Sequence, residues 1–456
     1  MSVPDKRSLL HNDIGSTLYR MTVPMLIGMF TLMSFNLVDT FFISLLGTKE
    51  LAAVSFTFPI TFTFISLAIG LGIGTSAVIA KALGSGNTQE ARADALASLW
   101  LAAYLMVALT FIGWLAHDSL FRLLGASDDI LPLIRQYMLI WLAGAVFLMI
   151  PMIGNSVLRA AGDTRLPAYI MAAGGVINAV LDPLLIFGLG PFPALGMQGA
   201  ALASVVSWVC GSLVVLLVLH QRRLIDQGWQ VWRKALPIYR KILRIGFPAA
   251  GANMLTPLAM AVLTAIIASH GAEAVAAFGV GIRLESMACL VVLALSTTLP
   301  PFISQNYGAG YLSRVQAAYK QSIRFILVWQ LVVYGLLALL AVWIARIFSA
   351  DAEVQRLIEL FLWILPVGYG LQGLIILTNS SLNALHLPLQ ALGLSICRLF
   401  VFYVPFAWLG GQLAGIQGLF IGCLVANLCM ALLSYFWFQR ALQRMELSEA
   451  SQGVAS

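Results

Sequence analysis

The sequence predicts an all-α integral membrane protein with twelve transmembrane helices in two pseudo-symmetric six-helix lobes. Hydrophobic residues make up 60% of the 456 residues and charged residues only 10%, whereas soluble domains are about 25% charged. Apolar runs long enough to cross a bilayer as helices recur along the whole chain. The two halves also resemble each other. This composition excludes a soluble enzyme, a disordered chain and a nucleic-acid-binding protein.

The individual helices follow from the apolar runs between polar breaks. These runs predict helices over residues 17–46, 52–82, 96–117, 131–157, 167–189, 198–219, 246–269, 274–306, 324–349, 355–382, 388–409 and 416–438. Several exceed the length that spans a bilayer, so we expect these helices to tilt, kink or protrude. The predicted domains are an N-lobe over 1–220, a basic cytoplasmic linker over 221–243, a C-lobe over 244–445 and a polar cytoplasmic tail over 446–456.

An internal repeat relates the two halves. Residues 24–86 match residues 248–310 without a gap, so that Pro24 aligns with Pro248 and Gly47 with Gly271. Six helices per repeat is an even number, so both halves insert in the same orientation and are related by an axis along the membrane normal. Two such lobes rocking against each other are typical of a transporter.

The basic residues predict the orientation. Most of the 26 Lys and Arg residues lie in the N-terminal tail and in connections on the same side of the membrane. The positive-inside rule then places both termini in the cytoplasm. The net charge of +7 therefore reflects topology and gives no indication of nucleic-acid binding. The polar N-terminus lacks a signal-peptide pattern, so we expect the first apolar run to be retained.

The five cysteines and five histidines predict no catalytic chemistry. The cysteines lie in apolar runs without metal-binding spacing, so we expect no disulfide framework. The histidines lie at helix ends or in tails, and no serine–histidine–acid or metal cluster can be assembled. We therefore expect no enzyme and no cofactor.

Two acidic residues lie deep within predicted helices, Asp39 in the first and Asp182 in the fifth. An ionised carboxylate at the bilayer centre costs roughly 2.5–3.5 kcal/mol, and such residues usually face a cavity or a partner and serve a function. Burial favours the neutral form of a carboxyl group, and a second carboxylate nearby favours it further. The pair is thus predicted to hold a proton near neutral pH and to release it when water enters. It is a candidate coupling site.

Asn178 lies one helical turn before Asp182, and Pro183 leaves the carbonyl of Ala179 without its helical donor. These oxygen ligands suit a small hard cation, so Asp39, Asn178 and Asp182 form a possible Na⁺ site. Alternatively, Asn178 simply provides a hydrogen bond to Asp182.

The first predicted helix carries Pro24, which should kink it, and a stripe of methionines spaced by four. Methionine suits a surface that accepts apolar ligands of different shapes, although ordinary helix packing is the favoured explanation. Aromatic rings nearby could meet aromatic or cationic ligands. The substrate-binding candidates are Met25, Met29, Met33, Phe35, Asn36 and Phe62.

The second half has no matching acids in the interior of its first and fourth helices. Arg398, well inside the eleventh helix, is predicted to snorkel or to cap backbone carbonyls; alternatively, it contacts an anion or the substrate. Arg283 and Glu285 are two residues apart and cannot pair on one helical face, so neither receives a role.

The sequence resembles the multidrug and toxic compound extrusion (MATE) family, in particular its DNA-damage-inducible protein F (DinF) branch. The resemblance covers essentially the whole chain. Its most specific matches are Val23-Pro24, Val38-Asp39-Thr40, Tyr137, and residues 159–164, 178–183 and 199–204. It implies a V-shaped pair of lobes with a cation or proton site at Asp39, Tyr137, Asn178, Asp182 and Ser204.

The function that the resemblance implies is secondary active multidrug efflux. Cationic or amphipathic compounds would leave by alternating access in exchange for H⁺, which we favour over Na⁺, and protonation of Asp39 and Asp182 would be coupled to bending of the first helix near Pro24. The resemblance also implies a multi-pass monomer in the bacterial inner membrane whose partners are drugs and membrane lipids. The alternative is a lipid-linked oligosaccharide flippase of the same superfamily, but its anionic headgroup would favour several cationic residues in the cleft. A membrane-embedded enzyme would need a catalytic cluster, and a purely structural membrane protein would not explain paired acids.

Overall fold

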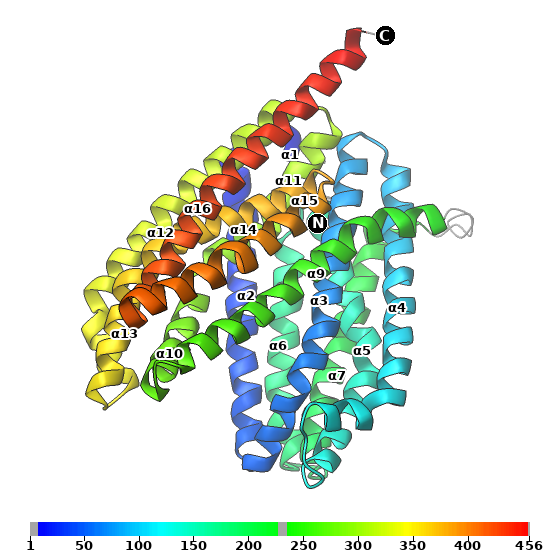
Figure 1. The fold of residues 1–456 in the computed structure, drawn as a ribbon. Coiled ribbons are helices and arrows are strands. Elements are labelled where there is room, and N and C mark those ends of the chain that lie inside the picture. The colour runs from blue at the N-terminus through cyan, green and yellow to red at the C-terminus, as the bar shows by residue number, and fades with distance from the viewer. Residues whose placement is uncertain (1–7, 227–234, 455–456) are drawn as a thin grey trace. The chain divides into compact units, whose positions relative to one another are not determined.

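The computed structural model describes residues 8–226 and 235–454, apart from the side chains of Ser8, Asn36 and residues 449–454. Within these ranges the chain consists of helices and their connections, without a strand, as Figure 1 shows. The all-α prediction is confirmed. Residues 227–234 of the predicted linker and the last two residues of the predicted tail lie outside the described ranges.

The first half of the chain forms long helices joined by short connections. They are α1 (Ser8–His11), α2 (Ile14–Ser44), α3 (Thr48–Gly84), α4 (Thr88–Leu123), α5 (Leu131–Ala160), α6 (Arg165–Ile186) and α7 (Met197–Gln221). Gly86 and Gly162 follow α3 and α5 with φ of +82° and +87°, the left-handed conformation that commonly ends a helix and that glycine adopts without strain.

The second half is also helical, with two irregular segments. Its helices are α9 (Ala235–Ala268), α10 (Ala272–Ala288), α11 (Leu290–Gly308), α12 (Leu312–Phe348), α13 (Ala352–Ile364), the 3₁₀-helix η1 (Leu365–Gly368), α14 (Tyr369–Ala384), α15 (Pro388–Ile396), the π-helix η2 (Cys397–Tyr403) and α16 (Val404–Val454). The η1 segment joins α13 to α14, and η2 joins α15 to α16.

The chain folds into two compact units. The first unit contains Tyr19–Ala250, and the second contains Gly251–Ser456 together with Asn12–Leu18. The division therefore falls inside α2 and inside α9, and not in a connection. The beginning of α9 belongs to the first unit, and the rest of this helix belongs to the second.

The helices account for the predicted membrane spans. Among the described residues, ten helices are long and apolar enough to cross a membrane, and α10 with α11, bent by 44°, makes an eleventh span. The last of the ten runs from Pro388 to Ser448 and is interrupted by non-helical backbone at Ala414 and Gly415. Divided there, it corresponds to the eleventh and twelfth predicted helices, so each predicted span has a counterpart.

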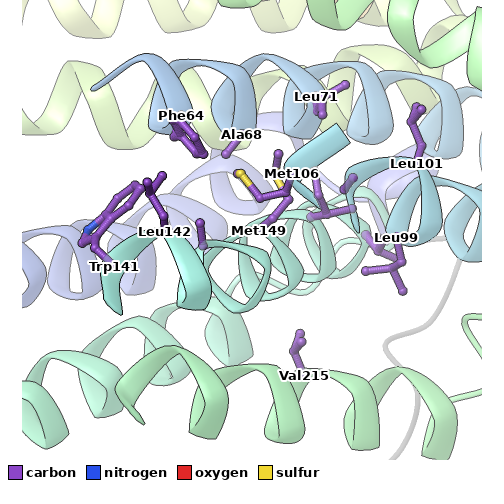
Figure 2. Packing of buried hydrophobic residues seen from close by; sticks show 14 of the residues in the cluster. Phe64, Ala68, Leu71, Leu99, Leu101, Met106, Trp141, Leu142, Met149 and Val215 are labelled. Carbon is purple, nitrogen blue, oxygen red and sulfur yellow. The ribbon is translucent and has the colours of Figure 1, made fainter. Parts of the chain in front are cut away.

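The core of the first unit surrounds α5, which packs against α3, α4 and α7. Figure 2 shows the buried side chains that these helices contribute, including Phe64 and Trp141. The Trp141 ring lies 5.5 Å from the Phe64 ring and 5.5 Å from the Trp208 ring, edge-on to both. Gly154 of α5 packs against the side chain of Val215 on α7, with no space for a larger residue. A small residue at this position lets the two helices approach closely.

Several helices extend well beyond their predicted bounds, among them α12, which begins at Leu312 and not at residue 324. α4 begins at Thr88, before residue 96, because Asn87 is its N-cap: the Asn87 side chain accepts from the Glu90 backbone N–H at 3.1 Å and donates to the Glu90 carboxylate at 2.8 Å. α9 begins at Ala235, inside the predicted linker, because Ile238 and Ile242 bury one face of its first turns. α16 continues to Val454, past residue 438.

Candidate functional site

Small residues bring α2 and α6 together. A side chain at Gly28 of α2 would place its first carbon 2.9 Å from Cα of Ala168 in α6. The ring of Phe35, also on α2, packs over Gly175 of α6. Asp39 follows Phe35 by one helical turn, so this close packing also brings its carboxyl group toward α6.

The carboxyl groups of Asp39 and Asp182 face each other across the two helices, closely enough to form a hydrogen bond. Asp182 is fully buried, with 0% exposure, and Asp39 is partly buried. Neither Asp39 Oδ1 nor Asp182 Oδ2, both buried, accepts a hydrogen bond from any described residue. An ionised carboxylate can only accept hydrogen bonds, so a hydrogen bond between these two groups requires a shared proton.

Asn178 links this pair to α7. Its amide nitrogen donates to Asp182 Oδ1 at 3.4 Å and to Ser204 Oγ at 3.4 Å. Both distances are long for hydrogen bonds. The amide therefore orients the Asp182 carboxyl group without fully satisfying it.

Tyr137 of α5 lies beside the same group of residues. It is buried, with 7% exposure, and interacts electrostatically with both Asp39 and Asp182. The structure thus brings Asp39, Tyr137, Asn178, Asp182 and Ser204 together from α2, α5, α6 and α7, all within the first unit.

The backbone of α6 adds one more acceptor. The helix continues through Pro183 to Ile186. Proline has no N–H, so the carbonyl of Ala179 lacks its helical donor. This carbonyl lies one turn before Pro183, next to Asn178 in the chain.

Two carboxyl groups so close together in a buried site favour a state with one proton between them, because like charges repel strongly where water is excluded. Their titration then belongs to the pair and not to either residue. Arrival or loss of this proton changes the charge between α2 and α6. A hard cation with oxygen ligands would also suit Asp39, Asn178 and Asp182. Among the described residues, no three His, Cys, Asp or Glu side chains are placed so that together they could hold a metal ion.

The substrate-binding candidates do not form one surface. Met25 is buried, with 1% exposure, whereas Met33 is 37% exposed, and Met29 and Phe35 are partly buried. Phe62 is partly buried, and its ring lies 5.4 Å from that of Phe58 on the same helix. The side chain of Asn36 is outside the described part of the structure.

α2 runs as one helix across Pro24. The proline leaves the carbonyl of Arg20 without its helical donor and weakens the helix at this point. The predicted kink at Pro24 stays a prediction.

The second unit contains a polar cluster that sequence reasoning missed. Gln372 of α14 donates to Glu285 of α10 at 2.9 Å, and Arg398 on the π-helix η2 interacts electrostatically with Glu285. Arg398 Nε is buried and donates to no described residue. These three residues are far apart in the chain, so the sequence does not show that they lie close together. The one sequence feature that could have pointed to them is that each is a polar residue within an apolar run.

A buried acid of the first unit was also missed. Asp94 of α4 is 1% exposed, and both of its carboxylate oxygens are buried without a hydrogen-bond partner among the described residues. The predicted helix start at residue 96 leaves Asp94 in a connection. The capping pattern Asn87 to Glu90 was the signal that would have placed it in the helix.

Comparison with known proteins identifies a matching family model and similar proteins. The MatE family model matches residues 24–184 and 248–409, once in each half, as the internal repeat predicts. The FAD transporter of Shewanella oneidensis is 42% identical over 447 residues, which cover 98% of this chain and 99% of that protein. The probable multidrug resistance protein NorM of Thermotoga maritima is 25% identical over 381 residues, covering 81% of each chain.

Solved structures are similar over nearly the whole chain. The Vibrio cholerae MATE transporter VcmN in the bent form has a TM-score of 0.91 and 35% identity, covering 95% of this chain and 98% of that one. A MATE protein in the straight conformation has a TM-score of 0.90 and 29% identity, covering 98% of this chain and 100% of that one.

Proposed function

Because this chain belongs to the MatE family of membrane transporters, we propose that it is an antiporter that exports small molecules in exchange for H⁺. The family match confirms the predicted MATE resemblance and the prediction that the protein is a transporter and not an enzyme. Its assignment to the DinF branch stays a prediction. The observation that carries the proposed coupling is the facing pair Asp39 and Asp182.

In the proposed mechanism, a proton enters from outside and is shared by the two carboxyl groups. The shared proton removes the repulsion between the carboxylates of Asp39 on α2 and Asp182 on α6, and the hydrogen bond between them draws the two helices together. When the site opens to the cytoplasm, water stabilises the ionised forms and the proton leaves. Asn178 and Tyr137 hold the pair in position. One elementary charge crossing 100 mV supplies about 2.3 kcal/mol, enough to drive modest accumulation of substrate outside.

We propose that this local change reaches the substrate pocket through bending of α2 at Pro24. The missing hydrogen bond at Arg20 makes this the weakest point of the helix. A bent form and a straight conformation are named for two similar solved structures, which supports the idea. H⁺ is favoured over Na⁺ because two carboxyl groups suffice for a proton, whereas Na⁺ needs a fuller set of oxygen ligands.

Two substrate classes are candidates. The multidrug resistance relative NorM of Thermotoga maritima, which is 25% identical, supports the predicted cationic or amphipathic compounds. A second candidate is FAD, because the FAD transporter of Shewanella oneidensis is 42% identical over nearly the full length of both chains. FAD is amphipathic and aromatic but carries phosphates, so it differs in charge from a cationic drug. We propose that FAD is the first compound to test.

We further propose a monomer in the bacterial inner membrane with both termini in the cytoplasm. The distribution of Lys and Arg supports this orientation, and the multi-pass architecture and bacterial relatives support the location.

The decisive experiment measures transport in proteoliposomes with a pH gradient and a Na⁺ gradient imposed separately. FAD and the cationic dye ethidium serve as the two probes. We expect the pH gradient to drive export by the wild type, and Asp39→Asn and Asp182→Asn each to reduce it more than tenfold. The matched control is Asp128→Asn, whose side chain is 85% exposed and which should transport normally. Pumping driven by Na⁺ alone, or full export by Asp39→Asn, would overturn the proposed coupling.

A further inference from the structure

A cavity lined by arginines lies at one end of the first unit's helices. Its volume is about 190 Å³, and Arg92, Arg222 and Arg223 line it together with Ile79 and Leu83. Arg92 lies near the start of α4 and the other two arginines follow the end of α7, whereas the two apolar residues lie near the end of α3. The cavity therefore combines positive charge with an apolar wall.

The acidic residues nearby leave part of this charge uncompensated. Arg222 Nη1 donates to Asp163 Oδ2 at 2.6 Å. Glu90, in the first turn of α4, pairs instead with Lys241 at 2.7 Å. Asp226 also lies here, because its backbone N–H donates to the carbonyl of Arg92 at 3.2 Å, but no acid of the described chain forms an ion pair with Arg92 or Arg223. Two guanidinium groups are thus available to an anion in the cavity.

The backbone at Arg223 is an independent sign of a function. Its φ is +54°, and its N–H donates to the carbonyl of His220 at 3.0 Å. Gly86 and Gly162 make the same turn at the ends of α3 and α5, with φ of +82° and +87°. A side chain in this left-handed conformation is strained, and strain that persists where glycine would remove it often marks a functional position.

We propose that this cavity binds the phosphate group of an anionic phospholipid, with Arg92 and Arg223 as the anion-binding residues. The planar guanidinium group donates paired hydrogen bonds that match phosphate oxygens. The cavity volume of about 190 Å³ leaves room for a phosphate group, with its adjoining glycerol carbons against Ile79 and Leu83. The proposal rests on the proposed orientation, which places this end at the cytoplasmic leaflet, where anionic lipids and basic pockets meet.

The test measures lipid binding by the full-length protein in neutral detergent. Phosphatidylglycerol and phosphatidylcholine with identical acyl chains are titrated separately, and the unfolding midpoint and the bound lipid, by native mass spectrometry, are recorded. We expect phosphatidylglycerol to raise the midpoint of the wild type and the double variant Arg92→Gln/Arg223→Gln to bind it at least tenfold more weakly. The matched control is Arg240→Gln/Arg440→Gln, which removes two exposed basic residues outside the cavity and should bind like the wild type.

The single variant Arg223→Gly keeps the test open if the double variant does not fold. Because glycine accepts the left-handed backbone, we expect a higher midpoint without lipid together with weaker binding of phosphatidylglycerol. Unchanged binding by the cavity variants, or equal binding of phosphatidylcholine, would overturn the site. An equal shift from inorganic phosphate alone would overturn the lipid as its ligand. No gradient is present in this measurement, so its result is independent of the proposed antiport.

Discussion

The amide of Asn178 donates to the carboxylate of Asp182 one turn further along α6, at 3.4 Å. The same amide lies 3.4 Å from Ser204 Oγ on α7. Asn178 therefore connects the aspartate that faces Asp39 to a helix on its other side. If the proton of the aspartate pair drives transport, this amide should set the orientation of one of the two carboxyl groups.

Replacing Asn178 by alanine should weaken coupling without preventing membrane insertion. A hydrogen bond to a charged or partly charged group contributes about 1 kcal/mol at such long distances, so we expect export driven by a pH gradient to fall about fivefold. Transport of FAD and ethidium in proteoliposomes measures this.

Ser204→Ala is the matched control for that prediction. It removes the second partner of the Asn178 amide but leaves the contact with Asp182 in place. Its effect should be smaller than that of Asn178→Ala. A larger loss in Ser204→Ala would mean that the amide acts mainly on α7 and not on the aspartate pair.

The aspartate site could largely be predicted from sequence, for a physical reason. A charged residue inside an apolar run is conspicuous, because the membrane makes it costly, and this identified Asp39 and Asp182 one at a time. The turn from Asn178 to Asp182 follows from helical spacing alone. That Tyr137 and Ser204 lie beside them came from the family resemblance, since four separate helices supply the five residues.

Other features depend on packing that the sequence does not reveal. The bond between Glu285 and Gln372 joins residues from two different helices of the second unit, and hydropathy carries no information about which faces meet. The early start of α9 depends on burial of Ile238 and Ile242 in the core of the first unit. The basic residues around them led us to predict a linker in this segment. Hydropathy identifies the apolar part of a helix, but it does not show how far the helix continues into polar sequence.

The contact between α3 and the beginning of α9 should be intolerant of a single methyl group. A side chain at Gly74 of α3 would lie 2.6 Å from the carbonyl oxygen of Ile242 and 3.1 Å from the backbone nitrogen of Gly246. Backbone atoms cannot move aside as a flexible side chain can, so Gly74→Ala should destabilise the protein by about 1–3 kcal/mol. The unfolding midpoint in detergent measures this change.

Gly335→Ala on α12 provides the opposite expectation from the same substitution. Nothing lies within 4 Å of a side chain added there, and alanine is favoured over glycine inside a helix by about 0.5–1 kcal/mol. The midpoint should therefore rise slightly. If both variants shift the midpoint in the same direction, the contact of Gly74 with α9 does not limit stability.

The charges of Glu285 and Arg398 in the second unit should depend on each other. Glu285 accepts from Gln372 at 2.9 Å and interacts electrostatically with Arg398. Removing one charge leaves the other uncompensated among apolar helices, whereas removing both does not. Glu285→Gln and Arg398→Gln should each destabilise by about 1–3 kcal/mol, and the double variant by less than their sum, with a coupling energy of at least about 0.5 kcal/mol.

Unfolding measurements on the two single variants and the double variant complete this cycle. Arg283→Gln is the control, because Arg283 lies two residues from Glu285 but its side chain is exposed, so its effect should simply add to that of Arg398→Gln. Strictly additive effects would show that Glu285 and Arg398 do not compensate each other. Arg398 would then need another partner, and the prediction that it contacts an anion or the substrate would gain weight over a purely structural role.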